Sequence, residues 1–183
     1  GTVCDIMPLT DENRIFVKRG LRRLTNSTNL GINALKKALG LDGKPIEVHH
    51  LSFRIGPSLN STGRLESAKE GVELLLTDDP ARAESLAQDM AKLNELRKEM
   101  TDRGVRTATD WVRKDIRMIP TEDGVKEKKI GDDKVIVLYM PGIHESIAGL
   151  IASKLKEAFY RPTLVFTDAE NGHGLKGSGR SIE

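Results

Sequence analysis

Apolar residues in the first eighty positions recur at the spacing of amphipathic helices. Val17, Leu21 and Leu24 lie at i, i+4 and i+7, which predicts a first helix. Two more helices are predicted over residues 32–39, where a glycine follows the last apolar position, and over residues 66–76. The first part of the chain is therefore expected to be mostly helical.

The longest periodic stretch begins after Pro80 and predicts a connecting helix. Apolar side chains repeat at intervals of three and four up to Met100, and the stripe resumes past Gly104. A glycine inside a helix costs about 1 kcal/mol relative to alanine, so a kink or break is expected there. Residues 120–133 are rich in Lys, Glu, Asp and Gly and are predicted to form a loop and a domain boundary.

The last part of the chain alternates between strand and helix patterns. Residues 135–140 and 163–167 are continuous apolar and β-branched runs, typical of strands buried on both faces, and residues 145–158 between them predict a helix. This order predicts a βαβ unit with a right-handed crossover. The predicted fold class is α/β, with a helical part in residues 1–77, a connecting helix in 78–120 and the βαβ-containing part in 121–183.

Composition narrows the classes of function. Hydrophobic residues make up 38% of the chain, enough for a globular core, whereas Phe, Tyr and Trp number only four, two and one. Few aromatic rings can then stack on bases, so nucleic-acid binding should depend on phosphate contacts. The net charge is only +2, and the single Cys4 excludes an internal disulfide. With no apolar run of bilayer length, a reducing cytoplasmic location without membrane attachment is expected.

A stretch rich in glycine near residue 180 indicates a phosphate site. Glycines with positive φ can turn backbone N–H groups toward one anion, and neighbouring hydroxyl and guanidinium groups add donors. A mobile tail or a plain turn is the alternative interpretation of the same composition. The candidate phosphate-binding residues are Lys176, Gly177, Ser178, Gly179, Arg180 and Ser181.

Three further stretches hold candidate functional residues. Asp5 is a lone carboxylate between apolar neighbours, which fits either a cap or a metal ligand. Residues 56–64, with two glycines and a proline, predict a rigid loop that presents Asn60 and Arg64 to an anion, although an ordinary surface loop has a similar composition. His144 follows a strand-ending turn and can either donate to a phosphate or cap the next helix.

Together these stretches resemble the RecJ family of single-stranded-DNA exonucleases, in the DHH phosphoesterase superfamily. Residues 1–9 resemble its fourth motif, whose aspartate binds metal, and residues 56–64 its G-P-x-L-N-x-x-G-R loop, whose arginine contacts DNA phosphate near the metals. Residues 144–153 are similar to the H-x-x-x-x-G-I-x-A-S helix of the DHH-associated domain. Residues 177–181 match its G-S-G-R-S, which helps to hold the 5′ phosphate.

The resemblance implies a domain assignment and an activity. Residues 1–77 correspond to the C-terminal part of a DHH catalytic domain, and 121–183 to the N-terminal part of the substrate-binding DHH-associated domain. The implied reaction is two-metal phosphodiester hydrolysis with Mn²⁺ or Mg²⁺, running 5′ to 3′ along single-stranded DNA in repair and recombination. The resemblance implies that Asp5 is a metal ligand and that Asp5 and Arg64 are catalytic residues. It also implies single-strand-binding protein and helicase as partners.

Departures from the family pattern limit this implication. The Asp-His-His signature, which supplies most metal ligands, and a later Gly-Gly-His stretch are absent, so the chain is expected to be an internal fragment that is inactive by itself. Ser58 stands where the family often has Arg, which removes one phosphate contact. Two alternatives stay open: a DHH phosphodiesterase acting on short oligoribonucleotides or cyclic dinucleotides, and a non-catalytic nucleic-acid-binding relative. An upstream Asp-His-His would exclude the second.

Overall fold

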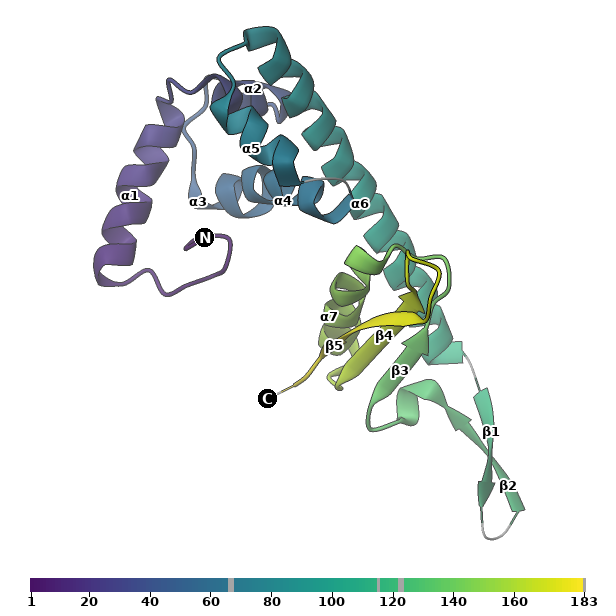
Figure 1. Cartoon of the computed structure of the whole chain (residues 1–183). Coiled ribbons are helices and arrows are strands. Elements are labelled where there is room, and N and C mark those ends of the chain that lie inside the picture. Colours follow the sequence, from purple (N-terminus) through teal and green to yellow (C-terminus); the bar gives the residue numbers. More distant parts are fainter. Residues whose placement is uncertain (66–67, 115, 122–123, 183) are drawn as a thin grey trace. The chain divides into compact units, whose positions relative to one another are not determined.

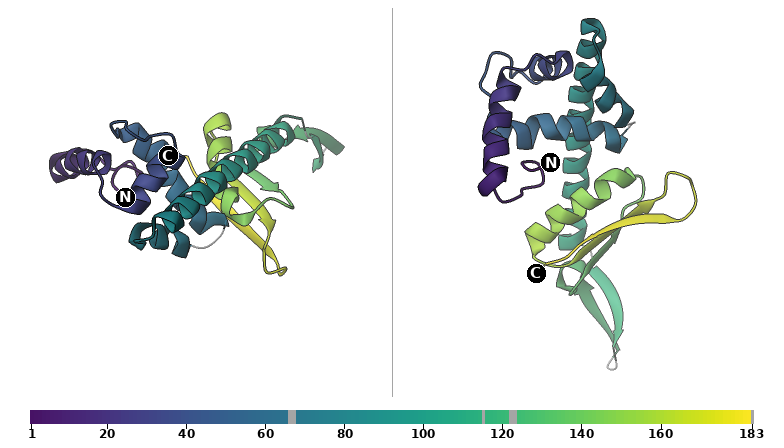
Figure 2. Two further views of the ribbon diagram at one scale, coloured as in Figure 1. Left: turned by 90° about the horizontal axis from the view of Figure 1, so that it is seen from above. Right: turned by 60° about the vertical axis from the view of Figure 1, so that its left-hand side comes forward.

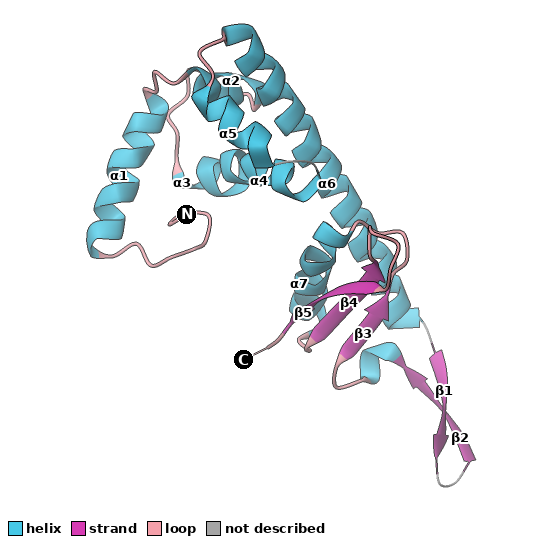
Figure 3. Ribbon diagram, viewed as in Figure 1, coloured by secondary structure: helices cyan, strands magenta, loops and turns pink. Residues whose placement is uncertain are grey.

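The structure, a computed structural model, describes residues 1–65, 68–114, 116–121 and 124–182. The chain divides into two compact units, Gly1–Leu96 and Arg97–Glu183. Among the described residues, the first unit contains helices and the second contains the strands (Figure 3). Helix α6 (Pro80–Lys114) contributes to both units, so the predicted connecting segment is divided between them.

Helices of the first unit follow the predicted order. The elements before α6 are α1 (Asp11–Thr25), α2 (Leu30–Ala38), α3 (Val48–His50), the π-helical turn η1 (Leu51–Ile55), α4 (Gly56–Leu65) and α5 (Ala68–Leu76) (Figure 1). The three helices predicted from periodicity are thus confirmed as α1, α2 and α5, although residues 66–67 lie outside the described part. Gly40 follows α2 with a φ of +65°, as its predicted capping position requires.

An aliphatic core holds the first unit together, and a buried lysine fixes the end of α1. Helix α1 has no fully buried residue of its own. Lys36 is only 6% exposed, and its Nζ donates to the carbonyls of Leu24 and Thr25 at 3.2 and 2.9 Å, where α1 ends. These carbonyls lack helical partners, so the ammonium satisfies them. The core residues are Leu35, Leu41, Ile46, Ile55, Leu74, Ala83, Leu86, Ala87 and Met90.

Residues 56–64 form most of helix α4, so the predicted rigid loop is wrong. Pro57 lies in the first turn, where helices accept proline. Gly56 serves packing: a Cβ at this position would lie 2.4 Å from Cys4 Sγ and 2.9 Å from the Leu51 carbonyl oxygen. The glycine therefore allows a close approach of chain segments rather than a turn.

The second unit contains the C-terminal part of α6 and two small sheets. Its further elements are β1 (Ile116–Thr121), β2 (Gly124–Lys129), η2 (Ile130–Asp132), β3 (Ile136–Tyr139), η3 (Glu145–Ile147), α7 (Ala148–Phe159), β4 (Thr163–Asp168) and β5 (Leu175–Arg180). Strands β1 and β2 are antiparallel, whereas the other sheet has the order β3-β4-β5 with β3 parallel to β4 and β5 antiparallel to it. The β3-α7-β4 connection confirms the predicted βαβ order.

Two expectations about residues 104–133 are wrong. Helix α6 runs through Gly104 without a break. The glycine is explained by packing, because a Cβ there would lie 2.5 Å from Ile151 Cδ1 of α7. Residues 116–121 and 124–129 pair as an antiparallel ladder rather than forming a loop. At one end of this ladder Thr121 is paired with Gly124.

One face of the three-stranded sheet is packed, and the other is partly exposed. Ile136 and Leu138 of β3 are buried, whereas Val137 and Tyr139 are 45% and 49% exposed, so the prediction of burial on both faces is wrong for β3. Helix α7 packs against β4 and β5 (Figure 2). The core on this face comprises Ala108, Val112, Ile130, Ile136, Leu138, Met140, Ile147, Ala148, Ile151, Ala152, Leu155 and Val165.

Candidate phosphate-binding site

Strand β5 directs three polar side chains toward α7. Lys176, Ser178 and Arg180 alternate along the strand, so they share one face of the sheet. Each is paired with a buried residue of β4, and the buried face is the one that packs against α7. These three residues therefore form a row of two cationic groups and one hydroxyl group beside α7.

Gly149 in the first turn of α7 leaves room for two of these side chains. A Cβ at this position would lie 2.8 Å from Ser178 Oγ and 2.9 Å from Arg180 Nη2. Arg180 Nη1 also donates to Ser178 Oγ at 3.0 Å and to the Gly179 carbonyl at 2.7 Å. None of the described carboxylates forms an ion pair with Arg180, so a guanidinium and a hydroxyl lie together at an exposed position suited to an anion.

The backbone of this motif differs from the predicted cradle. Gly177 and Gly179 lie in the extended strand β5, and the glycines with positive φ near it are Gly172 and Gly174, at +73° and +80°. The expectation of a cradle with positive φ is therefore wrong for the motif itself. Gly177 is explained by packing, since a Cβ there would lie 2.4 Å from Cδ1 of the Phe166 ring.

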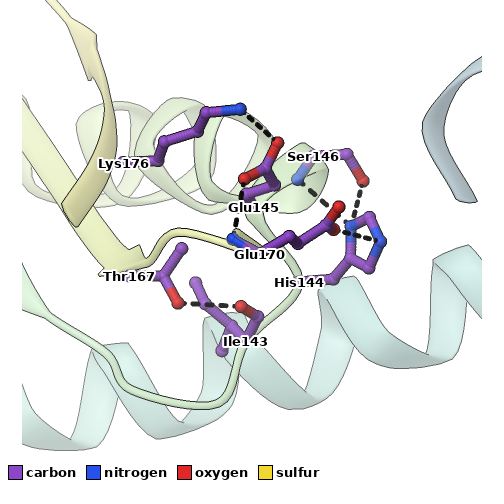
Figure 4. A network of polar contacts seen from close by, with 7 residues as sticks. All are labelled: Ile143, His144, Glu145, Ser146, Thr167, Glu170 and Lys176. Carbon is purple, nitrogen blue, oxygen red and sulfur yellow. Dashed lines mark hydrogen bonds and ion pairs between the residues drawn. The ribbon is translucent and has the colours of Figure 1, made fainter. Parts of the chain in front are cut away.

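A second polar cluster, shown in Figure 4, engages Lys176. Its Nζ donates to Glu145 Oε1 at 2.6 Å, and Glu145 Oε2 accepts the backbone N–H of Glu170 at 3.4 Å. The hydrogen bond from Lys176 lowers the pKa of Glu145, while Glu145 raises the pKa of Lys176. The ion pair of Glu145 therefore stabilises the fold fully at a pH above the usual pKa of a glutamate. This stabilisation is lost as the pH falls through the lowered pKa of Glu145.

His144 has both ring nitrogens engaged in the same cluster. Nδ1 accepts the N–H of Ser146 at 3.2 Å and lies 2.7 Å from the Ser146 hydroxyl, so His144 caps the helical turn that follows. Nε2 lies 2.8 Å from Glu170 Oε1. Of the two roles that the sequence left open for His144, capping is the one present in this arrangement. Thr167 adds a hydrogen bond from its Oγ1 to the Ile143 carbonyl at 2.8 Å.

Helix α4 exposes Asn60 but buries Ser58. Ser58 Oγ donates to the Arg54 carbonyl at 2.8 Å, so the buried hydroxyl is used within the helical segment. The backbone of Arg64 belongs to α4, whereas its side chain lies outside the described part of the structure. The structure therefore places Asn60 and the Arg64 backbone on one helix without testing the predicted phosphate contact.

Asp5 lies exposed in a turn before α1. In the described residues, no group of three or more His, Cys, Asp or Glu side chains is placed to hold a metal ion. A divalent cation of this class takes about six oxygen ligands, so one carboxylate is not a site. The described residues alone do not fit a two-metal centre, and Asp5 remains a predicted ligand.

Sequence reasoning missed the acidic partners of the site. Glu145 and Glu170 were not among the predicted site residues, although each contacts one of them. Only the adjacency of Glu145 to His144 indicated its position, because contacts between residues 25 to 31 positions apart leave no local pattern in the sequence. Gly149 was visible as part of the helix motif, but its contact with Ser178 and Arg180 was not.

The known proteins to which this chain is similar are exonucleases specific for single-stranded DNA. RecJ of Escherichia coli is 36% identical over 184 residues, and RecJ of Bacillus subtilis and RecJ of Thermus thermophilus are each 35% identical over 182. Each match covers the whole of this chain, which spans only 30%, 21% and 23% of these relatives. No protein-family model matches the chain.

Solved structures give the same result. The Mg²⁺ complex of Thermus thermophilus RecJ superimposes with a TM-score of 0.76 at 31% identity, over 99% of this chain and 25% of that one. A manganese-bound RecJ matches with a TM-score of 0.78 at 31% identity, over 100% of this chain and 40% of that one. These similarities confirm the resemblance: over its whole length the chain is similar in sequence and fold to part of RecJ. No described helix has the length and apolar character needed to cross a membrane.

Proposed function

We propose that this chain supplies the phosphate-binding part of a RecJ-type 5′-to-3′ exonuclease for single-stranded DNA. The observation that carries the proposal is the position of Ser178 and Arg180 against Gly149, where the guanidinium has no carboxylate partner among the described residues. A terminal 5′ phosphate is the ligand that such a pair can hold in register. Contacts to phosphate read no base, so binding at this site should not depend on sequence.

Other residues have proposed roles in the intact enzyme. Arg64 neutralises charge on the scissile phosphate, Asn60 contacts the backbone, and Asp5 is one metal ligand among several. Solved RecJ structures hold Mg²⁺ or Mn²⁺, and such ions supply an activated water and stabilise a leaving oxygen. By itself the chain is expected to release no nucleotides. The proposed setting is DNA repair and recombination in the cytoplasm, with single-strand-binding protein and helicase as partners.

Replacement of Arg180 tests the proposed phosphate site. In Arg180→Ala the affinity for a 5′-phosphorylated oligothymidylate should fall by about 1.5–3 kcal/mol, because a charge-assisted hydrogen bond is lost. The same oligonucleotide with a 5′ hydroxyl should lose much less. Both affinities are measured by fluorescence anisotropy at low ionic strength with the 183-residue chain.

Lys154→Ala is the matched control, because Lys154 is an exposed cation of α7 already paired with Glu157. It should leave the ratio of the two affinities unchanged. Equal losses for both oligonucleotides in Arg180→Ala would show that Arg180 contributes general charge and would refute a terminal-phosphate site.

A further inference from the structure

Few side chains of strand β5 fix its register, although Gly177 fits against the Phe166 ring. The two central glycines of this strand carry no side chains to pack, and apart from Ser178 its residues are exposed. Glycine-rich strands specify register weakly, and a shift of one residue moves every side chain to the opposite face of the sheet. Such a shift would carry both Ser178 and Arg180 away from α7. The phosphate site therefore requires a contact that holds β5 in place.

The Glu145–Lys176 ion pair is such a contact. Glu145 lies in the helical turn η3 that leads into α7, and its carboxylate binds both β5, through Lys176 Nζ, and the β4–β5 loop, through the N–H of Glu170 (Figure 4). The Glu145 side chain is 20% exposed, against 61% for Lys176. The carboxylate is therefore the shielded partner, and the flexible lysine reaches to it.

The ion pair and the phosphate site use the same face of β5, because Lys176 and Arg180 are an even number of residues apart. Lys176 and Arg180 are separated by four positions of β5, and Glu145 and Gly149 by four positions of the segment entering α7. Four residues of strand span about 13 Å, so Lys176 does not share the position of Arg180. Fixing Lys176 on Glu145 thereby sets which face of β5 lies over Gly149.

A second side-chain contact holds the loop before β5. His144 Nε2 contacts Glu170 Oε1 at 2.8 Å, and Glu170 is also the residue whose N–H binds Glu145. The loop between β4 and β5 is thus attached twice to the residues that precede α7. Both residues predicted as additional phosphate ligands, His144 and Lys176, are used in these attachments.

We propose that Glu145 is a positioning residue of the phosphate site, and that Lys176 acts through Glu145 rather than as a phosphate ligand. This inference rests on the proposed function, because it concerns the same site. A positioning role and direct phosphate binding by Lys176 predict opposite changes in affinity when the Glu145 carboxylate is removed. If Lys176 bound phosphate and Glu145 competed for it, removing the carboxylate would strengthen binding; if Glu145 positions β5, removing it weakens binding.

The experiment compares Glu145→Gln, Lys176→Met, the double variant and the exchanged pair Glu145→Lys/Lys176→Glu. The ratio of affinities for 5′-phosphorylated and 5′-hydroxyl oligothymidylate should fall about three- to tenfold in each single variant, the scale of a modest ion pair with its hydrogen bond. The double variant should lose no more than either single one. The exchanged pair should recover only the part of the ratio that depends on the Glu145–Lys176 contact, because a lysine at position 145 cannot accept the N–H of Glu170. Lys154→Met and Glu157→Gln, an exposed pair within α7, are the controls.

Hydrogen exchange provides a readout that needs no DNA. Amides of β5 should exchange faster in Glu145→Gln and Lys176→Met, with little change in β3, and the control pair should change neither. Stronger binding in Glu145→Gln, or unchanged exchange together with an unchanged ratio, overturns the positioning role. If the unmodified chain shows no preference for the 5′ phosphate, the proposed function fails and the inference fails with it, even where the exchange of β5 responds.

Discussion

Helix α4 and strand β5 each combine two glycines with an arginine, but different neighbours require their glycines. In α4 a Cβ on Gly56 would meet a backbone carbonyl as well as Cys4 Sγ, whereas Gly63 is exposed and has only an ordinary contact at 3.7 Å. In β5 a Cβ on Gly177 would meet the Phe166 ring, and Gly179 has an ordinary contact at 3.6 Å. Each motif therefore has one glycine that packing requires.

The difference lies in what the required glycine touches. A carbonyl fixed in a helical turn cannot move without disturbing its hydrogen bonds, so Gly56 holds a rigid junction between η1 and α4. The ring of Phe166 is a half-buried side chain that can rotate. We infer that the element carrying Arg64 is fixed by backbone contacts, whereas the element carrying Arg180 depends on side chains, including the Glu145–Lys176 pair.

The largest expected effect belongs to Arg64, the arginine on the rigid element. In an intact enzyme carrying this sequence, Arg64→Ala should lower kcat by about 100- to 1000-fold, the scale for losing one donor to developing charge, with a smaller rise in KM. Steady-state kinetics on single-stranded DNA measure both constants. A pure KM effect would instead make Arg64 a binding residue like Arg180.

A rigid junction also predicts a loss of stability when Gly56 is replaced. Gly56→Ala should lower the free energy of unfolding by about 1–3 kcal/mol, the usual range for overpacking, because the new methyl group meets the Leu51 carbonyl and Cys4. Urea denaturation measures the change. Gly63→Ala, in the same helix but with only an ordinary contact at 3.7 Å, should instead gain up to about 1 kcal/mol. Similar losses in both variants would contradict the assignment of the clash.

Helices and strand order were predictable because each follows from a local period. The stripe through Leu86 and Met90 predicts α6, and the apolar run before Met140 predicts β3, since periodicity reflects the face that a segment buries. The pattern failed where glycine was interpreted as a break, as part of a loop or as part of a phosphate cradle. Regular elements contain Gly104, Gly56 and Gly177, and at each position a residue distant in sequence leaves no room for a Cβ.

The sequence predicted which types of residue form the candidate site, but not how they contact one another. The motif near Arg180 indicated phosphate, and the structure adds the contact with Gly149 that brings guanidinium and hydroxyl together. The acidic partners could not be predicted, because an ion pair such as Glu145–Lys176 depends on the register of β5 and on where α7 begins. Such placement is a tertiary property, with no signal within a window of a few residues.

The smallest expected effect tests the dependence of β5 on side chains. Gly177→Ala should lower the free energy of unfolding by only about 1 kcal/mol, at the low end for overpacking, because the Phe166 ring can move away. Phe166→Leu should restore part of this loss in the double variant, whereas Gly179→Ala should cost nothing, since its Cβ meets Leu164 at an ordinary 3.6 Å. Urea denaturation compares the unmodified chain with the three single variants and the double variant. If the double variant loses as much as the sum of the single ones, the ring does not explain Gly177, and β5 is held as rigidly as α4.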